Sequence, residues 1–235
     1  MALNTKNIQQ QPGKKRDPID PGPYPARVVQ VLDLGLQKQY PWKGKEKPPC
    51  YKIHITYELV DEFMLDDEGN EDTDQPRWVS EDFPVYSLSA ENAKSTERYN
   101  AIDPECIHEG DFGAVGGMAC TVNVVNKAGK GANAGKVYDN VGGVSTIRKR
   151  DAANCPELVN EVVMFDLDNP DIAVFNDLPD FLQNKIKSNL EFEQSKLQVL
   201  LGGGVVPTVT ASEVEGVVAG AMSEVSDEEG GDEKW

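Results

Sequence analysis

The sequence has 235 residues and no apolar stretch long enough to cross a bilayer, which needs about 20 residues. Its longest apolar runs, such as Val159–Phe165 and Leu197–Leu201, are much shorter. Met1–Gln11 is polar and has none of the apolar core of a secretory signal peptide. These absences predict a cytoplasmic protein with no membrane partner.

Cysteine and histidine are also scarce. The chain has four cysteines and two histidines, and no two cysteines form a C-x-x-C pair. A structural zinc site needs about four closely spaced ligands. We therefore expect free thiols in a reducing compartment, without a metal site or a cofactor.

Motifs that carry catalysis are missing as well. Gly131–Val137 resembles a phosphate-binding loop, but it is one residue short and lacks the Ser or Thr after Lys136. Neither histidine has a neighbouring pattern typical of a nucleophilic site. The carboxylates of Asp61–Asp74 do not match the register of an EF-hand, so we expect a solvated acidic loop over Phe63–Pro76. These patterns predict a protein that is not an enzyme.

What the chain does have is charge that is segregated along its length. The net charge is −17, yet Met1–Glu58 holds ten lysines and arginines against five acids. A second basic cluster lies between Lys127 and Arg150, whereas the residues after Thr210 are mostly acidic or small. The negative net charge therefore hides a basic main part of the chain followed by an acidic C-terminal tail.

Alternating apolar and polar residues predict five strands. Every second residue of Cys50–Val60 is apolar, which places Tyr57 in the core. Gly35 in the first strand indicates a bulge or bend. A segment that starts at Ser89, its expected N-cap, predicts a helix between the third and fourth strands. The strands are expected at Tyr24–Gln37, Cys50–Val60, Arg77–Leu88, Met118–Asn126 and Lys136–Arg148, and the helix at Ser89–Ala101.

This order of elements is that of the OB-fold, a five-stranded Greek-key barrel. We therefore predict a mainly β protein with an OB-fold barrel at residues 21–150. OB-folds bind oligonucleotides on strands two and three, and in the loops that join strands one to two and four to five. In this sequence those two loops are basic.

Composition divides the rest of the chain into three parts. Residues 1–20, rich in Gln, Lys and Pro, are expected to form a flexible arm. Residues 151–204 are expected to form an extension with one helix over Leu178–Leu200, where apolar residues recur at helical spacing. Residues 205–235 are Gly-rich and acidic, which predicts a disordered tail.

Single-strand binding needs a positive groove for phosphates and aromatic faces on which bases stack at about 1–3 kcal/mol each. The loop at Lys38–Pro49 interleaves both kinds of residue. The candidate nucleic-acid contacts are Lys38, Tyr40, Trp42, Lys43, Lys45 and Lys47 in this loop, Lys52 and His54 on the second strand, Arg77, Trp78 and Tyr86 on the third, and Lys127, Lys130, Lys136 and Tyr138 on the hairpin between the fourth and fifth.

Each group has a plainer alternative. Tyr40 and Trp42 could fold back onto the barrel, and Trp78 could fill its core. Lys52 and His54 lie on the side of the second strand opposite its apolar residues, so they could face water without touching a ligand. The lysines of the hairpin could serve solubility alone.

The C-terminal tail ends in an aromatic residue after two acidic runs. An exposed Trp235 on a disordered tail has no packing role in its own fold. The tail could mimic nucleic acid and occupy the basic groove, or it could dock Asp232, Glu233 and Trp235 onto a partner protein with a basic-rimmed pocket.

Three short runs, Pro21–Gly35, Tyr57–Glu62 and Leu190–Phe192, resemble bacteriophage single-stranded DNA-binding proteins. The acidic tail is similar to that of the T7-type phage protein and of bacterial single-stranded DNA-binding proteins, but it ends in Lys234-Trp235 rather than Pro-Phe. The resemblance implies a role in phage DNA replication, recombination and repair in the host cytoplasm. It also implies homodimers, and phage or host replication and recombination proteins as partners of the tail.

The sequence thus predicts a sequence-nonspecific binder of single-stranded DNA whose affinity falls with salt. Its net charge leaves open a second hypothesis, an acidic interaction protein or DNA mimic that inhibits another enzyme. A third is an RNA-binding OB protein, since stacking and phosphate contacts do not require the 2′-hydroxyl.

Overall fold

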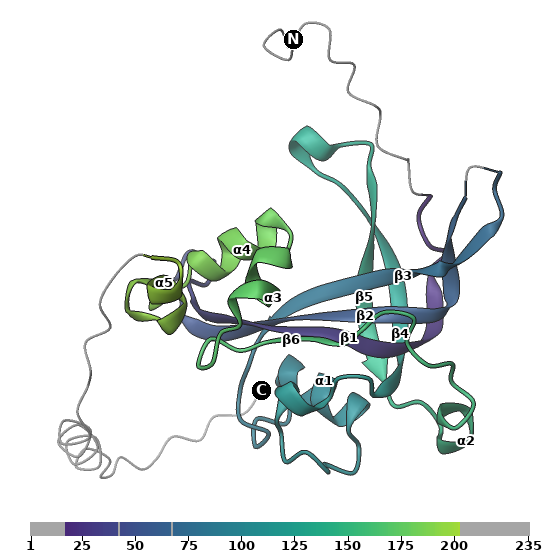
Figure 1. Cartoon of the computed structure of the whole chain (residues 1–235), viewed down its shortest axis with the longest axis horizontal. Helices are drawn as coiled ribbons and strands as arrows, with labels where there is room; N and C mark the ends of the chain where they lie inside the picture. The colour runs from purple at the N-terminus through teal and green to yellow at the C-terminus, as the bar shows by residue number, and fades with distance from the viewer. Residues whose placement is uncertain (1–16, 42, 67, 203–235) are drawn as a thin grey trace, which may run out of the picture.

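A computed structural model describes residues 17–41, 43–66 and 68–202. Five strands form an antiparallel sheet in the order β3-β2-β1-β4-β5, which is curled into an OB-like barrel (Figure 1). The mainly β fold predicted from the sequence is therefore confirmed, while the predicted disorder of the arm and the tail falls almost wholly outside the described residues. The strands are β1 (Gly22–Gln37), β2 (Cys50–Leu65), β3 (Glu71–Pro84), β4 (Ala119–Ala128) and β5 (Val137–Ser145).

β1 organises the sheet because it has a different partner along each half. Gly22–Arg27 pairs with β4, and Gln30–Leu32 pairs in parallel with β6 (Val163–Phe165). β2 pairs with β1 along most of its length, with a register shift between Asp33 and Leu36. Gly35 lies in that shift with a φ of 67°, so the bend predicted there is confirmed.

The curl of the sheet brings its edge strands β3 and β5 together. Arg77 Nη2 lies 3.1 Å from Asp139 Oδ2, and the backbone N–H of Ile19 donates to Asp139 Oδ1 at 3.0 Å. Arg77 also donates to the backbone carbonyl of Asp17 at 2.7 Å. The segment before β1 and two side chains thus bridge the gap between β3 and β5.

The inside of the barrel is an apolar core that includes Tyr57, as predicted. Helix α1 (Lys94–Ile102) covers one end of the barrel and adds Tyr99 and Ile102 to this core (Figure 1). Tyr99 packs edge-on against Phe112 of the short 3-10 turn η2 (Phe112–Ala114), with ring centroids 5.2 Å apart.

Two predicted boundaries are wrong. The helix starts at Lys94 rather than near Ser89, because the hydroxyls of Ser87 and Ser89 bond each other in a series of turns. The loop expected over Phe63–Pro76 is largely strand, since β2 and β3 continue as a hairpin closed at a turn held by Asp66.

The C-terminal extension forms a second core on the outside of β1. Leu32 and Leu34 of β1 pack there against apolar side chains of the extension, including Phe165 and Phe175. The remaining elements are η3 (Gly131–Asn133) in the β4–β5 hairpin, and α2 (Lys149–Ala152), α3 (Ile172–Asp177), α4 (Asp180–Lys187), η4 (Phe192–Gln194) and α5 (Lys196–Leu200) in or next to the extension.

The single helix expected over Leu178–Leu200 is therefore wrong. α4 ends at Lys187, and the chain turns because the backbone N–H of Leu190 donates to the carbonyl of Leu36 at 2.8 Å. Asn189 is buried at this turn, where its side-chain amide donates to the carbonyl of Ile186. Contacts with the end of β1 thus override the helical spacing of the sequence.

Among the described residues no helix is long and apolar enough to span a bilayer. Cys50, Cys106, Cys120 and Cys155 are all free thiols. Within the same ranges, no group of three or more acidic, cysteine or histidine side chains is arranged to hold a metal ion.

Candidate nucleic-acid interface

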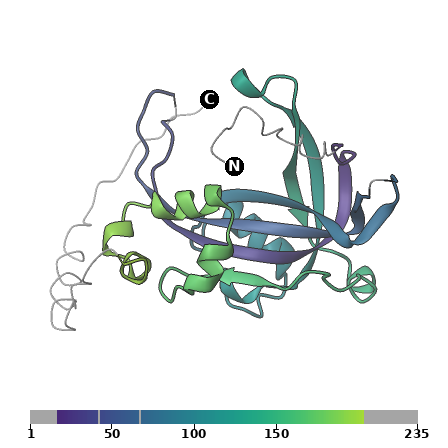
Figure 2. The same ribbon diagram turned by 45° about the horizontal axis from the view of Figure 1, so that its top comes forward.

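Two basic arms project from the barrel. The first arm is the loop at residues 38–49, between β1 and β2, and the second arm is the tip of the β4–β5 hairpin at residues 126–138. Both rise toward the top of the view in Figure 2. These are the two loops that the sequence predicts as ligand-binding.

β3 joins the bases of the two arms. Asp82 on β3 lines a pocket with Lys38 and Tyr40 of the first arm, and Arg77 on β3 pairs with Asp139 at the base of the second. Arg77 and Asp82 are five residues apart, which corresponds to about 16 Å of extended strand. The outer face of β3 is therefore a short track from one arm to the other.

The first arm is open to solvent. Tyr40 is 91% exposed, so the alternative that it folds back onto the barrel is wrong. Lys38, Lys43, Lys45 and Lys47 are exposed as well, and the arm turns at Lys43 and Gly44, which both have positive φ. Trp42 lies outside the described residues.

The arms differ from the body of the protein in how their positive charges are compensated. Most basic residues of the body are paired with acids, as in Arg27–Glu157, Arg98–Glu81 and Lys149–Glu105. Within the described ranges no acidic side chain forms an ion pair with the cationic groups of Lys38, Lys45, Lys52, Lys127 and Lys130. These uncompensated cations make the arms positive despite the negative net charge.

The pocket at the base of the first arm has a volume of about 600 Å³. We call it the basic pocket. Its charged lining is Lys38, Lys52 on β2, Lys185 on α4, and Asp82. Tyr40 stands at its rim, and Leu34 and Gln37 of β1 also contribute to it. Sequence reasoning missed Lys185, because nothing in the helical spacing of residues 178–200 indicates what the polar side of that helix faces.

Asp82 connects the basic pocket to a buried polar chain. It accepts a hydrogen bond from His54 Nδ1 at 2.6 Å through Oδ1, and one from Lys185 Nζ through Oδ2. Burial by itself would raise the pKa of the Asp82 carboxyl, but these two donors outweigh it and lower that pKa below its usual value. The carboxylate is therefore charged at neutral pH.

His54 corrects a prediction. It is 5% exposed and bonds Asp82 and Thr56, so it does not lie on a water-exposed face of β2. Glu58, further along the same side, is 1% exposed and accepts hydrogen bonds from the extension, 2.7 Å each from the Val159 N–H and the Asn160 side chain. The C-terminal extension covers most of the outer face of β2 and leaves Lys52 at its edge partly exposed.

Trp78 on β3 is anchored and partly open. Its indole N–H donates to Glu58 Oε2 at 3.1 Å, while 44% of the residue stays exposed. It lies outside the barrel core, so the alternative that it fills the core is wrong. Trp78 and Asp82 are four residues apart on the same face of β3, which separates them by about 13 Å.

Arg77 and Tyr86 do not join this track. The guanidinium of Arg77 is committed to Asp139 and to the Asp17 carbonyl across the edge strands. Tyr86 follows the end of β3, where its backbone N–H donates to Ser95 of α1. It belongs to the end of the barrel that α1 covers.

The second arm carries four of the predicted contacts. Lys127 and Tyr138 are cross-strand partners and so lie on one face of the hairpin. Lys130 is exposed at the tip, and Lys136 donates to Asn133 Oδ1 at 3.3 Å. The other predicted contacts, Asp232, Glu233 and Trp235, lie outside the described residues.

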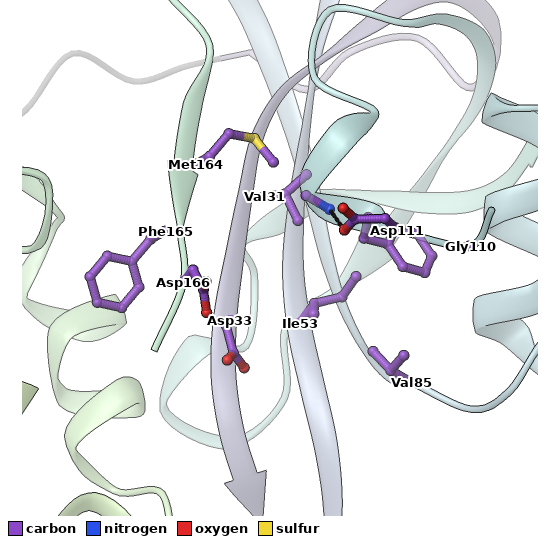
Figure 3. Close-up of a pocket in the computed structure, with 11 residues that line it drawn as sticks. Val31, Asp33, Ile53, Val85, Gly110, Asp111, Met164, Phe165 and Asp166 are labelled. Carbon is purple, nitrogen blue, oxygen red and sulfur yellow. Dashed lines mark hydrogen bonds between the residues drawn. The ribbon is translucent and has the colours of Figure 1, made fainter. Parts of the chain in front are cut away.

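A second pocket, of about 480 Å³, has the opposite charge. We call it the acidic pocket. Figure 3 shows Asp33 and Asp166 beside one another, with Asp111 across from them and Ile53 between; Val85 also lines the pocket. Burial raises the pKa of Asp33, against the backbone hydrogen bonds from Gly35 and Leu167. The three carboxylates of the acidic pocket repel phosphate, so this pocket is no candidate for a nucleic-acid contact.

Comparison of the chain with protein-family models, with curated proteins and with solved structures finds no match.

Proposed function

We propose that the protein binds single-stranded DNA without sequence preference, along the track from the first arm over β3 to the second arm. The observation that carries the proposal is the first arm itself. An almost fully exposed Tyr40 stands in the loop that OB-folds use for ligands, together with Lys38 and Lys45, which have no ion-pair partner among the described residues. Such a surface suits a chain of phosphates with accessible bases.

The lysines and the aromatic residues of the track have different roles in this proposal, because their side chains differ in chemistry. Lysines are point charges that neutralise backbone phosphates, and each neutralised phosphate releases counter-ions from the strand. Tyr40, Trp78 and Tyr138 offer aromatic surface on which any base can stack. Base-specific recognition would need donors and acceptors placed at base edges, and the track offers mainly lysines and rings.

The wider role extends the resemblance to phage single-stranded DNA-binding proteins. The protein would coat unwound DNA during phage replication, recombination and repair in the host cytoplasm. Its acidic tail would recruit replication or recombination enzymes, or occupy the basic track until DNA displaces it. The same resemblance implies a homodimer, which light scattering of the full chain tests.

A salt titration of binding to a fluorescent oligo(dT) tests the proposal, with duplex DNA and oligo(U) alongside. We expect tight binding to the single strand that weakens steeply with salt, and weaker binding to the duplex. A variant that lacks residues 223–235 should bind equally well or more tightly, because it has lost a competing polyanion.

Absence of binding by both forms at low salt would refute the proposal. It would favour the alternative of an acidic interaction protein or DNA mimic. The acidic pocket and the net charge of −17 are the features on which that alternative depends. Equal affinity for oligo(U) and oligo(dT) would instead widen the ligand to RNA.

A further inference from the structure

We infer that the C-terminal extension contributes a phosphate-binding residue to this site, Lys185, and that Asp82 is the internal counter-ion that a phosphate displaces from it. The inference depends on the proposed function, since it assigns a role within the same site. It gives α4 a part in binding beyond covering the outside of the barrel.

The packing of α4 sets where Lys185 points. Leu182 and Ile186, one turn apart, are buried against the outside of β1 in the second core. The backbone carbonyl of Lys185 accepts a hydrogen bond from Gln37 Nε2 at 3.0 Å, which ties the helix to the point where the first arm begins. The side chain of Lys185 reaches from there into the basic pocket.

The charges of the basic pocket are unbalanced. Three lysines line it, Lys38, Lys52 and Lys185, against the single carboxylate of Asp82. Lys185 pairs with that carboxylate, and within the described residues neither of the other two has an ion-pair partner. The surplus of positive charge attracts an anion, and a phosphodiester of the bound strand has the chemistry to supply it.

The hydrogen bonds of Asp82 allow Lys185 to leave it for a phosphate at a small cost in free energy. The ion pair with Lys185 is partly exposed, with side chains 36% and 30% accessible, and such pairs contribute little to stability. When Lys185 turns to a phosphate, Asp82 keeps the hydrogen bond from His54 through its other oxygen. The carboxylate is thus never left without a donor while Lys185 changes partner.

The first test compares Lys185→Gln with a matched variant on the same helix, Lys187→Gln. Lys187 is exposed, lies over the ring of Phe175 at 5.4 Å and does not line the basic pocket, so each variant removes one charge from α4. The measurement is the salt dependence of oligo(dT) binding by the full-length protein, with a thermal melt to confirm folding.

We expect Lys185→Gln to lower the slope of log K against log salt by about 0.7, the value for one phosphate contact on a single strand. Affinity at 50 mM salt should fall by about five- to tenfold, because that slope is worth a factor of about five for each tenfold change in salt. Lys185→Arg should retain the wild-type slope, and so should Lys187→Gln.

A double-mutant cycle with Asp82→Asn tests the counter-ion. Asn keeps the shape of the side chain and an oxygen for His54, but it no longer competes for Lys185. Asp82→Asn should therefore tighten binding, and the gain should shrink when it is combined with Lys185→Gln. An equal gain in both backgrounds would mean that Asp82 acts only by repelling the strand, and would overturn its role as counter-ion.

The outcomes separate the inference from the proposed function. If the wild type binds no single strand at low salt, the proposed function itself fails. If the wild type binds and Lys185→Gln has the same slope and affinity as Lys187→Gln, the proposed function stands and the inference is wrong.

Discussion

The end of β1 lies between two pockets of opposite charge. Leu34 and Gln37 contribute to the basic pocket, whereas Val31 and Asp33 contribute to the acidic pocket. Successive side chains of a strand point to opposite faces, and the register shift at Gly35 changes this alternation before Gln37, so one short segment contributes to both pockets. The two pockets have similar volumes, about 600 and 480 Å³, and differ mainly in the residues that other elements bring to them.

This contrast shows why the net charge of −17 is a poor guide to binding. A phosphate responds to the potential within about one Debye length, roughly 8 Å at physiological salt. Over that distance the lysines of the basic pocket outweigh Asp82, whatever the charge of the acidic pocket or the tail. Local pairing of charges therefore decides which surface can take a polyanion.

The largest effect that the contrast predicts comes from reversing charge in each pocket. Lys38→Glu with Lys52→Glu should weaken oligo(dT) binding at 50 mM salt by about 50-fold or more, because two phosphate contacts are lost and repulsion is added. Asp166 lines the acidic pocket, and the exposed Asp168 lines an adjoining pocket that shares Asp33 with it; we call the two pockets together the acidic side. Asp166→Lys with Asp168→Lys, the same four-unit change on the acidic side, should alter affinity by less than about threefold. Fluorescence anisotropy measures both, and comparable effects of the two variants would erase the distinction between the pockets.

A smaller effect distinguishes the aromatic residues of the two sides. Tyr40 stands at the basic pocket, whereas Tyr51, 54% exposed, donates to Glu191 in the pocket that adjoins the acidic pocket at Asp33. Tyr40→Ala should cost about 1–3 kcal/mol of binding free energy if one base stacks on it, and Tyr40→Phe should cost little. Tyr51→Ala should leave affinity unchanged. The idea of a stacking residue fails if the two alanine variants bind alike.

The two aspartates of this region should respond oppositely to pH. The pKa of Asp82 is lowered in the folded protein, so its stabilising contribution is present above its unfolded pKa and is lost as pH falls through the folded value. The pKa of Asp33 is raised, mainly by burial, so its contribution is present below its unfolded pKa and is lost as pH rises through the folded value.

The corresponding measurement is urea unfolding of two asparagine variants. At pH 7, Asp82→Asn should lower the free energy of unfolding by about 1–3 kcal/mol, mainly because it removes the charge from the hydrogen bond with the buried His54. Asp33→Asn should be neutral or stabilising at that pH. Both differences should diminish near pH 3, where the wild-type carboxyls take up protons; loss of stability in Asp33→Asn at pH 7 would contradict the assignment.

Local sequence patterns predicted those features of the fold and of the candidate site that depend on residues close together in the sequence. The alternation through Cys50–Val60 identified β2 and the burial of Tyr57, and Gly35 marked the bend of β1. The order of strands and the position of α1 followed from spacing and turn residues. Whether Tyr40 of the first arm is exposed or folds back onto the barrel could not be predicted from these patterns, and the structure shows that it is exposed.

The rest depends on contacts between distant segments. Alternation placed His54 outside the barrel correctly, but it could not reveal that the extension buries that side. Lys185 reaches the first arm only because α4 packs on Leu32 and Leu34, and that contact also breaks the predicted long helix. The strand pairing at Asp72 was missed because acidic residues are uncommon in strands.

The smallest effect concerns the distant field of the acidic side. Asp166→Asn with Asp168→Asn removes two negative charges without adding positive ones, and should tighten oligo(dT) binding by about twofold or less at 20 mM salt. The gain should vanish near 0.3 M, because screening then confines interactions to a few ångströms. A gain that persists at high salt would show that the strand passes close to these carboxylates, and the track would have to be extended around the end of β1 toward the acidic pocket.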